Sequence, residues 1–150
     1  MDLKKTGGLL TLNEGNRLHV YKDSLGIYTI GVGVNVDKAQ GGPGLRPETV
    51  DYQLQLDLCD WTEQLQNALP FFAQLSDVRQ AVLVDICHNV RGNLRGLLKF
   101  EKMLGSMEVE DWSSAAMHLL DSKLHSDVPK RTERNANMLL SNKWPKEIGD

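Results

Sequence analysis

Residues 17–37 read RLHVYKDSLGIYTIGVGVNVD, and they contain the clearest evidence for strands in the chain. It is rich in β-branched and aromatic side chains, which favour strands. From Ile30 to Val36 a β-branched residue stands at every second position, which is the side-chain period of a strand. The residues from Asp23 to Gly26 are typical of a turn. Residues 17–37 therefore predict a small antiparallel sheet.

The rest of the chain favours helices. Ala39 to Pro47 is rich in glycine and proline and is expected to be a loop. From Pro47 to Ala68 apolar residues recur every three or four positions, which predicts one long amphipathic helix with proline in its first turn. Asp77 to Val90 is apolar on nearly all sides, as in a helix at the centre of a core. Further helices are expected over residues 93–104, 109–120 and 129–140.

These elements predict an α+β fold. A chain of 150 residues is the size of one ordinary domain with one core. We expect a small antiparallel sheet lobe over about residues 14–46, a linking helix over about 47–69 and a larger helical lobe over about 70–150. Two such lobes leave a cleft between them, and clefts commonly hold extended ligands.

Charge and hydropathy exclude several classes of protein. The net charge is −3 and neither half of the chain is strongly basic, which argues against nucleic acid as the ligand. The longest apolar runs are far shorter than the roughly 20 residues of a membrane span. The amino-terminal residues 1–11 lack the apolar region of a secretory signal, so we expect a protein that starts in the cytoplasm without stable membrane insertion.

Cys59 and Cys87 both lie in expected helices with apolar neighbours, which favours two buried thiols over a disulfide framework. The two cysteines and the four scattered histidines show none of the paired spacings of a zinc site. We therefore expect no metal and no other cofactor.

Two carboxylates, Glu14 and Asp23, are the candidates for catalysis. Cleavage of a glycosidic bond needs a proton donor and a second group that activates water or captures the sugar. Glu14 closes the amino-terminal segment, Asp23 lies in the first turn of the expected sheet, and Thr29 follows on the next strand. By spacing alone, solvated surface charge is the more common explanation for two such carboxylates. Thr29 is likewise at home in a strand.

The context of these residues resembles the active-site segment of the phage-type lysozymes. The matching strings are Asn13-Glu14-Gly15, Tyr21-Lys22-Asp23 and Tyr28-Thr29-Ile30-Gly31-Val32-Gly33. Later segments are similar in the same order: residues 78–89 resemble the family's central helix, 102–104 and 112–116 its later helices, and 129–134 the start of its carboxy-terminal helix. The resemblance covers most of the chain except the glycine-rich loop and the extreme ends.

The resemblance implies an inverting muramidase with a lysozyme-like fold. Glu14 would protonate the β-1,4 bond between N-acetylmuramic acid and N-acetylglucosamine in bacterial peptidoglycan. Asp23 and Thr29 would hold the attacking water, which suits a hydroxyl that both donates and accepts. Arg131 would be a charged partner of Glu14, against the alternative of a plain surface residue.

Four more residues stand where the family contacts sugar. They are Gly33, Asn35, His88 and Asn89. A satisfied core or capping residue is an equally good interpretation of His88 and Asn89. Val34 departs from the family pattern, since many relatives have a histidine there, and the acidic balance departs from the basic character common in the family. Attraction to an anionic cell wall should therefore be weaker.

The resemblance also implies a biological setting. This setting is that of a phage endolysin, which waits in the host cytoplasm until a separate pore protein (a holin) admits it to the periplasm or cell wall. We expect a monomer. Two alternatives remain open. A lytic transglycosylase would not need the water-holding Asp23 and Thr29, and a non-catalytic wall-binding or phage structural domain would not need Glu14.

Overall fold

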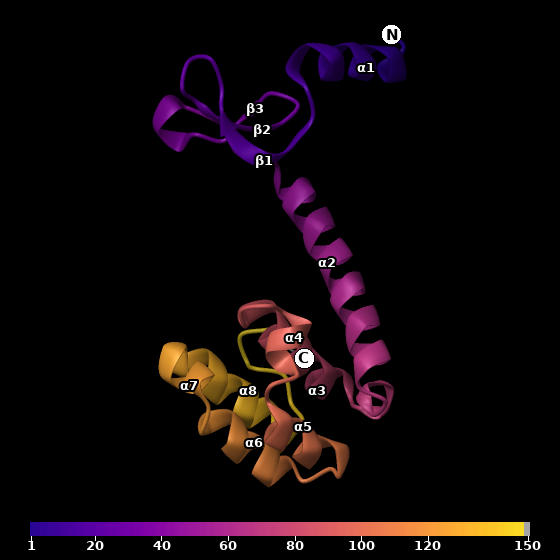
Figure 1. Cartoon of the computed structure of the whole chain (residues 1–150), viewed down its shortest axis with the longest axis vertical. Coiled ribbons are helices and arrows are strands. Elements are labelled where there is room, and N and C mark those ends of the chain that lie inside the picture. Colours follow the sequence, from indigo (N-terminus) through magenta and orange to yellow (C-terminus); the bar gives the residue numbers. More distant parts are fainter. Residues whose placement is uncertain (149–150) are drawn as a thin grey trace. The chain divides into compact units, whose positions relative to one another are not determined.

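The computed structural model describes residues 1–148, which fall into two compact units that meet within one helix. The first unit comprises residues 1–55 and the second begins at Leu56. Within the described residues the chain forms eight α-helices and one three-stranded antiparallel sheet, so the expected α+β class is confirmed. Figure 1 shows the strands in the first unit and the helices α3 to α8 gathered in the second.

The sheet has the simplest order, β1-β2-β3. Strand β1 (Arg17–Lys22) pairs antiparallel with β2 (Tyr28–Gly31), and β2 pairs antiparallel with β3 (Val34–Asn35). A register shift interrupts the first pairing between Arg17 and Tyr21. The sheet predicted over residues 17–37 is therefore confirmed. A short 3-10 helix, η1 (Lys38–Gln40), lies in the segment expected to be a loop.

The amino-terminal segment is helical, which the sequence analysis did not predict. Helix α1 (Leu3–Glu14) begins where the side chain of Asp2 accepts a hydrogen bond from the Lys5 backbone N–H. Such a cap satisfies one of the free N–H groups of the first turn. Gly7 and Gly8 weaken the helical pattern, because glycine is a poor helix former. The capping residue Asp2, and not a helical period of apolar residues, was the sequence feature that could have predicted α1.

The second unit is a bundle of helices. Its elements are α2 (Pro47–Ala68, which begins in the first unit), the 3-10 helix η2 (Phe72–Gln74), α3 (Asp77–Asn89), α4 (Leu94–Leu97), α5 (Glu101–Glu108), α6 (Trp112–Leu120), α7 (Lys123–Asp127) and α8 (Pro129–Ser141). The predictions of α2, α3 and α8 are confirmed to within a residue at each end.

Two of the predicted helices have different bounds. The helix expected over residues 93–104 is broken into α4 and α5, because Phe100 leaves the helical region with ψ of 49° and packs partly against the core. The helix expected from Val109 begins only at Trp112. Glu110 has a left-handed φ of 58°, and Asp111 caps the new helix by accepting from the Ser114 N–H. Short helix α7 was not predicted.

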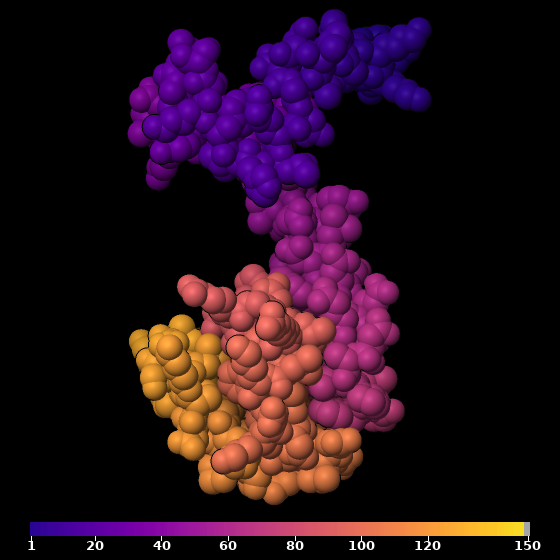
Figure 2. Space-filling model, in the orientation of Figure 1, coloured from indigo at the N-terminus to yellow at the C-terminus, as the bar shows by residue number. Residues whose placement is uncertain are grey.

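The hydrophobic core lies in the second unit, which appears as one closely packed body in the space-filling view (Figure 2). Arg79 of α3 links three of its helices. Its Nε and Nη2 each donate to the Leu139 carbonyl of α8 at 3.1 Å, and its guanidinium lies 3.6 Å from the ring centre of Trp112 on α6. The most deeply buried side chains include Leu65, Phe72, Val82, Leu83, Ile86, Leu97, Met103, Met107, Leu119 and Leu139.

The two cysteines differ in environment. Cys87 is buried in α3, as expected, and burial raises the pKa of its thiol. Cys59 is exposed on α2, so the expectation of a buried thiol is wrong there. In this helix the apolar face that reaches the core is formed by Trp61 and Leu65, and Cys59 does not belong to it. Both thiols are free.

Among residues 1–148, no helix combines the length and the apolar character needed to cross a lipid bilayer. The same residues contain no group of three or more His, Cys, Asp or Glu side chains placed to hold a metal ion.

Candidate active site

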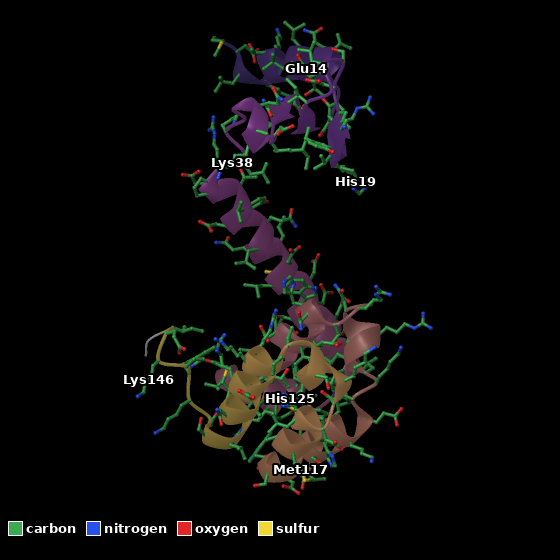
Figure 3. The ribbon with its side chains drawn as sticks, turned by 90° about the vertical axis from the view of Figure 1, so that its left-hand side faces the viewer. Glu14, His19, Lys38, Met117, His125 and Lys146 are labelled. Carbon is green, nitrogen blue, oxygen red and sulfur yellow. The ribbon has the colours of Figure 1, made fainter. Side chains whose placement is uncertain are left out.

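Glu14 is the last residue of α1, and its side chain lies against the turn between β2 and β3. A methyl group placed on Gly33 would come within 3.1 Å of Glu14 Oε2 and 3.3 Å of its carboxyl carbon. Figure 3 labels Glu14 where α1 ends beside the sheet. Gly15 makes this position possible, because its φ of +74° turns the chain sharply at the end of α1. The Glu14 side chain remains exposed to solvent.

This contact assigns Gly33 a clear structural role, which is to leave room for Glu14. Gly33→Ala is expected to displace the carboxyl and to strain a backbone with φ of +70°. The carboxyl has to move by a few tenths of an ångström, so if Glu14 acts in catalysis the rate should fall, by less than the roughly 100-fold that a displacement of about 1 Å can cost. Hydrolysis of peptidoglycan and the thermal midpoint should both be measured.

Gly41→Ala is the matched control, since Gly41 has the same φ of +70° but no atom within 4 Å of an added methyl group. Both variants should lose stability, and only Gly33→Ala should also lose activity at temperatures where it is folded. Equal activity in the two variants would show that the contact with Glu14 has no catalytic importance.

Asp23 organises the turn that leads into β2. Its Oδ1 accepts hydrogen bonds from the backbone N–H groups of Leu25 at 2.8 Å and Ile27 at 2.9 Å. The backbone closes the same turn, because Asp23 N–H donates to the Ile27 carbonyl at 3.0 Å. Within the described part of the chain, no hydrogen bond engages Oδ2. The side chain is therefore held in one orientation with one oxygen left to accept a proton or a water.

Thr29 lies on β2, opposite Tyr21 of β1 and Asn35 of β3. It is buried, with 4% of its surface exposed, and its hydroxyl donates to the Ile27 carbonyl at 3.1 Å. These contacts give Thr29 a structural role in the sheet. Its predicted part in holding water stays a prediction.

Asn35 organises the loop that follows β3. Its Oδ1 accepts from the Asp37 N–H at 2.8 Å, its backbone carbonyl accepts from the Gly44 N–H at 3.3 Å, and its side chain packs against Gly42 so closely that a methyl group there would overlap it. Contact of Asn35 or Gly33 with sugar stays a prediction.

In the second unit, Arg131 of α8 binds Asp85 of α3. Arg131 Nε donates to Asp85 Oδ2 at 2.9 Å and Nη2 donates to Oδ1 at 2.7 Å, so the two side chains form a bidentate ion pair. Asn135 Nδ2 adds a hydrogen bond to Oδ2 at 2.7 Å. Asp85 was not among the residues predicted from the sequence. Asp85 is the one charged residue in the otherwise apolar run from Ala81 to Cys87, and this was the signal that could have found it.

The ion pair shifts the pKa values of both Asp85 and Arg131. Burial by itself raises the pKa of Asp85, but the hydrogen bonds from Arg131 and Asn135, with the charges of Arg131 and His88, outweigh it and hold this pKa below its ordinary value. The hydrogen bond to Asp85 raises the pKa of Arg131 further above its already high value, against the opposing effect of burial. The predicted pairing of Arg131 with Glu14 stays a prediction.

The lowered pKa of Asp85 makes a prediction for acid stability. A carboxyl whose pKa is lower in the folded state stabilises the fold above its unfolded pKa of about 3.9 and loses this effect as pH falls through the folded value. Asp85→Asn should therefore lower the thermal midpoint near neutral pH, and the difference from the parent should shrink below about pH 4. The side chains of the pair are 34% and 36% exposed, so screening by water should keep the difference to a few degrees. A difference that persists unchanged at pH 3 would contradict this account.

The two remaining candidate residues lie at the end of α3. His88 is exposed, and its ring lies 4.8 Å from that of Trp61 on α2 with an angle of 55° between the planes. Asn89 is half-buried, and its Oδ1 accepts from Arg131 Nη1 at 3.2 Å. Both residues thus have partners within their own unit. Their contact with sugar stays a prediction.

An α+β protein with a glutamate held against a small sheet, and with an aspartate in the adjoining turn, has the groups that a glycoside hydrolase of the lysozyme type needs. A family model described as phage lysozyme matches residues 11–131. The chain therefore belongs to the phage lysozyme family, and the resemblance identified from the sequence is confirmed.

Two similar proteins come from Dictyostelium discoideum. The protein named "Probable T4-type lysozyme 2" is 28% identical over 150 residues, covering 84% of this chain and 88% of that relative. "Probable T4-type lysozyme 1" is 22% identical over 152 residues with the same coverage. Family membership supports lysozyme-like hydrolysis of a glycan.

Proposed function

We propose that this chain is an inverting muramidase that hydrolyses the β-1,4 bond between N-acetylmuramic acid and N-acetylglucosamine in peptidoglycan. The observation that carries the proposal is the placement of two carboxylates about β2. Glu14 lies against Gly33 in the turn after this strand, and Asp23 lies in the turn before it. Inverting hydrolysis requires one carboxylic acid and one carboxylate on opposite faces of the sugar.

In the proposed reaction the carboxyl proton of Glu14 passes to the glycosidic oxygen as the bond to the anomeric carbon breaks. A water attacks that carbon from the opposite face and gives a proton to Asp23 Oδ2. The N–H groups of Leu25 and Ile27 hold Oδ1 and so fix the plane of this carboxylate. Thr29 donates its proton to the Ile27 carbonyl, and its oxygen can still accept a hydrogen bond from the water.

Two analyses of the products test the mechanism. Mass spectrometry of digested peptidoglycan should find reducing muramic acid ends. Anhydro ends would identify a lytic transglycosylase, and an absence of products would identify a non-catalytic domain. An NMR time course should show the inverted α anomer first, whereas a β anomer formed first would indicate a covalent intermediate.

Further residues are assigned to the proposed site on the family resemblance. Arg131 supports Glu14 as a charged partner, and Gly33, Asn35, His88 and Asn89 contact the glycan. The ion pair with Asp85 already balances the charge of Arg131, so its effect on Glu14 should be weaker than that of an unpaired arginine.

The biological part of the proposal also rests on the family resemblance. The protein is a bacteriophage endolysin that acts as a monomer, reaches the wall from the host cytoplasm through a separate pore protein and causes lysis of the host cell. Added from outside, it should clear a suspension of bacteria whose outer membrane has been permeabilised. Failure to clear such cells, with purified peptidoglycan still cleaved, would restrict the proposal to the enzymatic step.

A further inference from the structure

A polar cluster joins α3 to α8 in the second unit. It consists of Asp85 and Asn89 from α3 with Arg131 and Asn135 from α8, and we call it the Asp85 cluster. The carboxylate stands at its centre and receives hydrogen bonds from two atoms of Arg131 and from Asn135. Asn135 is 4% exposed, so this side of the cluster is closed to solvent.

The contacts leave Arg131 very little freedom. Its Nε and Nη2 are both engaged with the Asp85 carboxylate, and Nη2 also donates to the Asp85 backbone carbonyl at 3.3 Å. Nη1 donates to Asn89 Oδ1 at 3.2 Å. A guanidinium has five N–H groups. Four of them are therefore used within the described part of the chain, and one Nη1–H remains.

Arg131 in turn determines the orientation of Asn89. Because Asn89 Oδ1 accepts from Nη1, the two Nδ2–H groups of its amide must lie on the other side of the amide carbon. Among residues 1–148 these N–H groups have no hydrogen-bond acceptor. They are neighbours of the remaining Nη1–H, since Nη1 and Oδ1 are 3.2 Å apart and Oδ1 and Nδ2 share one carbon.

We propose that Asp85 is a positioning residue, which holds Arg131 and through it Asn89 so that their adjacent N–H groups bind an acyl oxygen of the glycan. Such an oxygen is either the carbonyl of an N-acetyl group or a carboxylate oxygen of a muramic acid. The proposal rests on the proposed function for the identity of the ligand. Asp85 itself touches no substrate, and its effect is to remove the rotational freedom that binding would otherwise have to restrict.

Asp85→Asn is the sharpest test, because it keeps the shape of the side chain. An asparagine has no negative charge and offers only one oxygen, so it cannot bind Nε and Nη2 of Arg131 through two separate oxygens as the carboxylate does. The freed guanidinium should then release Asn89. We expect kcat/KM on soluble peptidoglycan fragments to fall by about 10- to 100-fold, which is the scale of a misplaced contact.

Arg79→Lys is the matched control. Arg79 also connects α3 to α8, through the Leu139 carbonyl, but it takes no part in the Asp85 cluster. Both variants should have lower thermal midpoints, and only Asp85→Asn should lose activity well below its midpoint. If Asp85→Asn is as active as Arg79→Lys, Asp85 is a stabilising ion-pair residue and the proposal is wrong. If Asp85→Asn does not fold, Asp85→Glu replaces it, because the longer side chain keeps the charge but moves the carboxylate.

A binding experiment separates this proposal from the proposed function. An oligomer of N-acetylglucosamine should shift the NMR signals of the Asn89 Nδ2–H₂ group in the parent and in Arg79→Lys, and should do so much more weakly in Asp85→Asn. A shift only with an oligomer that contains muramic acid would identify the carboxylate as the ligand group. If the parent binds these oligomers but cleaves no peptidoglycan, the proposed function fails while the Asp85 proposal survives. If neither oligomer shifts the Asn89 signals of the parent, the Asp85 proposal fails even when hydrolysis is normal.

Discussion

Glu14→Gln is expected to slow the hydrolysis of peptidoglycan by about 10²- to 10⁴-fold, which is the usual contribution of a general acid. Glutamine keeps the length and shape of the side chain but has no proton of suitable acidity to give to the glycosidic oxygen. The fold should be unaffected, because Glu14 is exposed and accepts no hydrogen bond within the described part of the chain. The release of reducing ends from purified peptidoglycan measures the effect.

Glu63→Gln is a suitable control for this experiment. Glu63 is exposed in the carboxy-terminal half of α2, within the second unit, and Glu63→Gln makes the same change in net charge as Glu14→Gln. It should retain the parent's activity. If Glu14→Gln cleaves peptidoglycan as fast as Glu63→Gln, then Glu14 is not the general acid, and another carboxylate must supply the proton.

Strong local patterns made much of the fold predictable. The alternation of valine and glycine after Thr29 and the turn residues from Asp23 to Gly26 identify the sheet, since both reflect local backbone preferences. Proline in the first turn and a long apolar period likewise identify α2 (Pro47–Ala68). What could not be predicted depends on tertiary packing or on single backbone angles, such as the break at Phe100 and the left-handed Glu110.

In the candidate site, too, some features could be predicted from the sequence and others depend on tertiary packing. The spacing of Glu14, Asp23 and Thr29 was readable from the sequence through the family resemblance. The contact between Glu14 and Gly33 was not, because it depends on how α1 ends against the turn after β2. The ion pair between Asp85 and Arg131 could not be predicted from the sequence either, since it joins residues 46 positions apart. Patterns of residue type predict which helices and strands form, whereas long-range polar pairs can be identified only in the packed structure.

Asp23→Asn is expected to reduce hydrolysis by about as much as the loss of a general base does, 10²- to 10⁴-fold, and to leave the sheet intact. Asparagine can keep the turn, because its Oδ1 can accept from the N–H groups of Leu25 and Ile27 as the carboxylate does. It cannot take a proton from water. The substitution therefore separates the two roles that the structure and the proposed function give to this side chain.

Asp23→Ala completes the comparison, because it removes the turn hydrogen bonds as well as the base. It should be as inactive as Asp23→Asn and less stable by about 1 kcal/mol for each hydrogen bond lost. Activity on peptidoglycan and thermal unfolding should be measured for both variants. If Asp23→Asn retains full activity while Asp23→Ala loses both activity and stability, Asp23 acts only by shaping the turn before β2. The attacking water would then have to be activated by another group, and the inverting mechanism would lose its base.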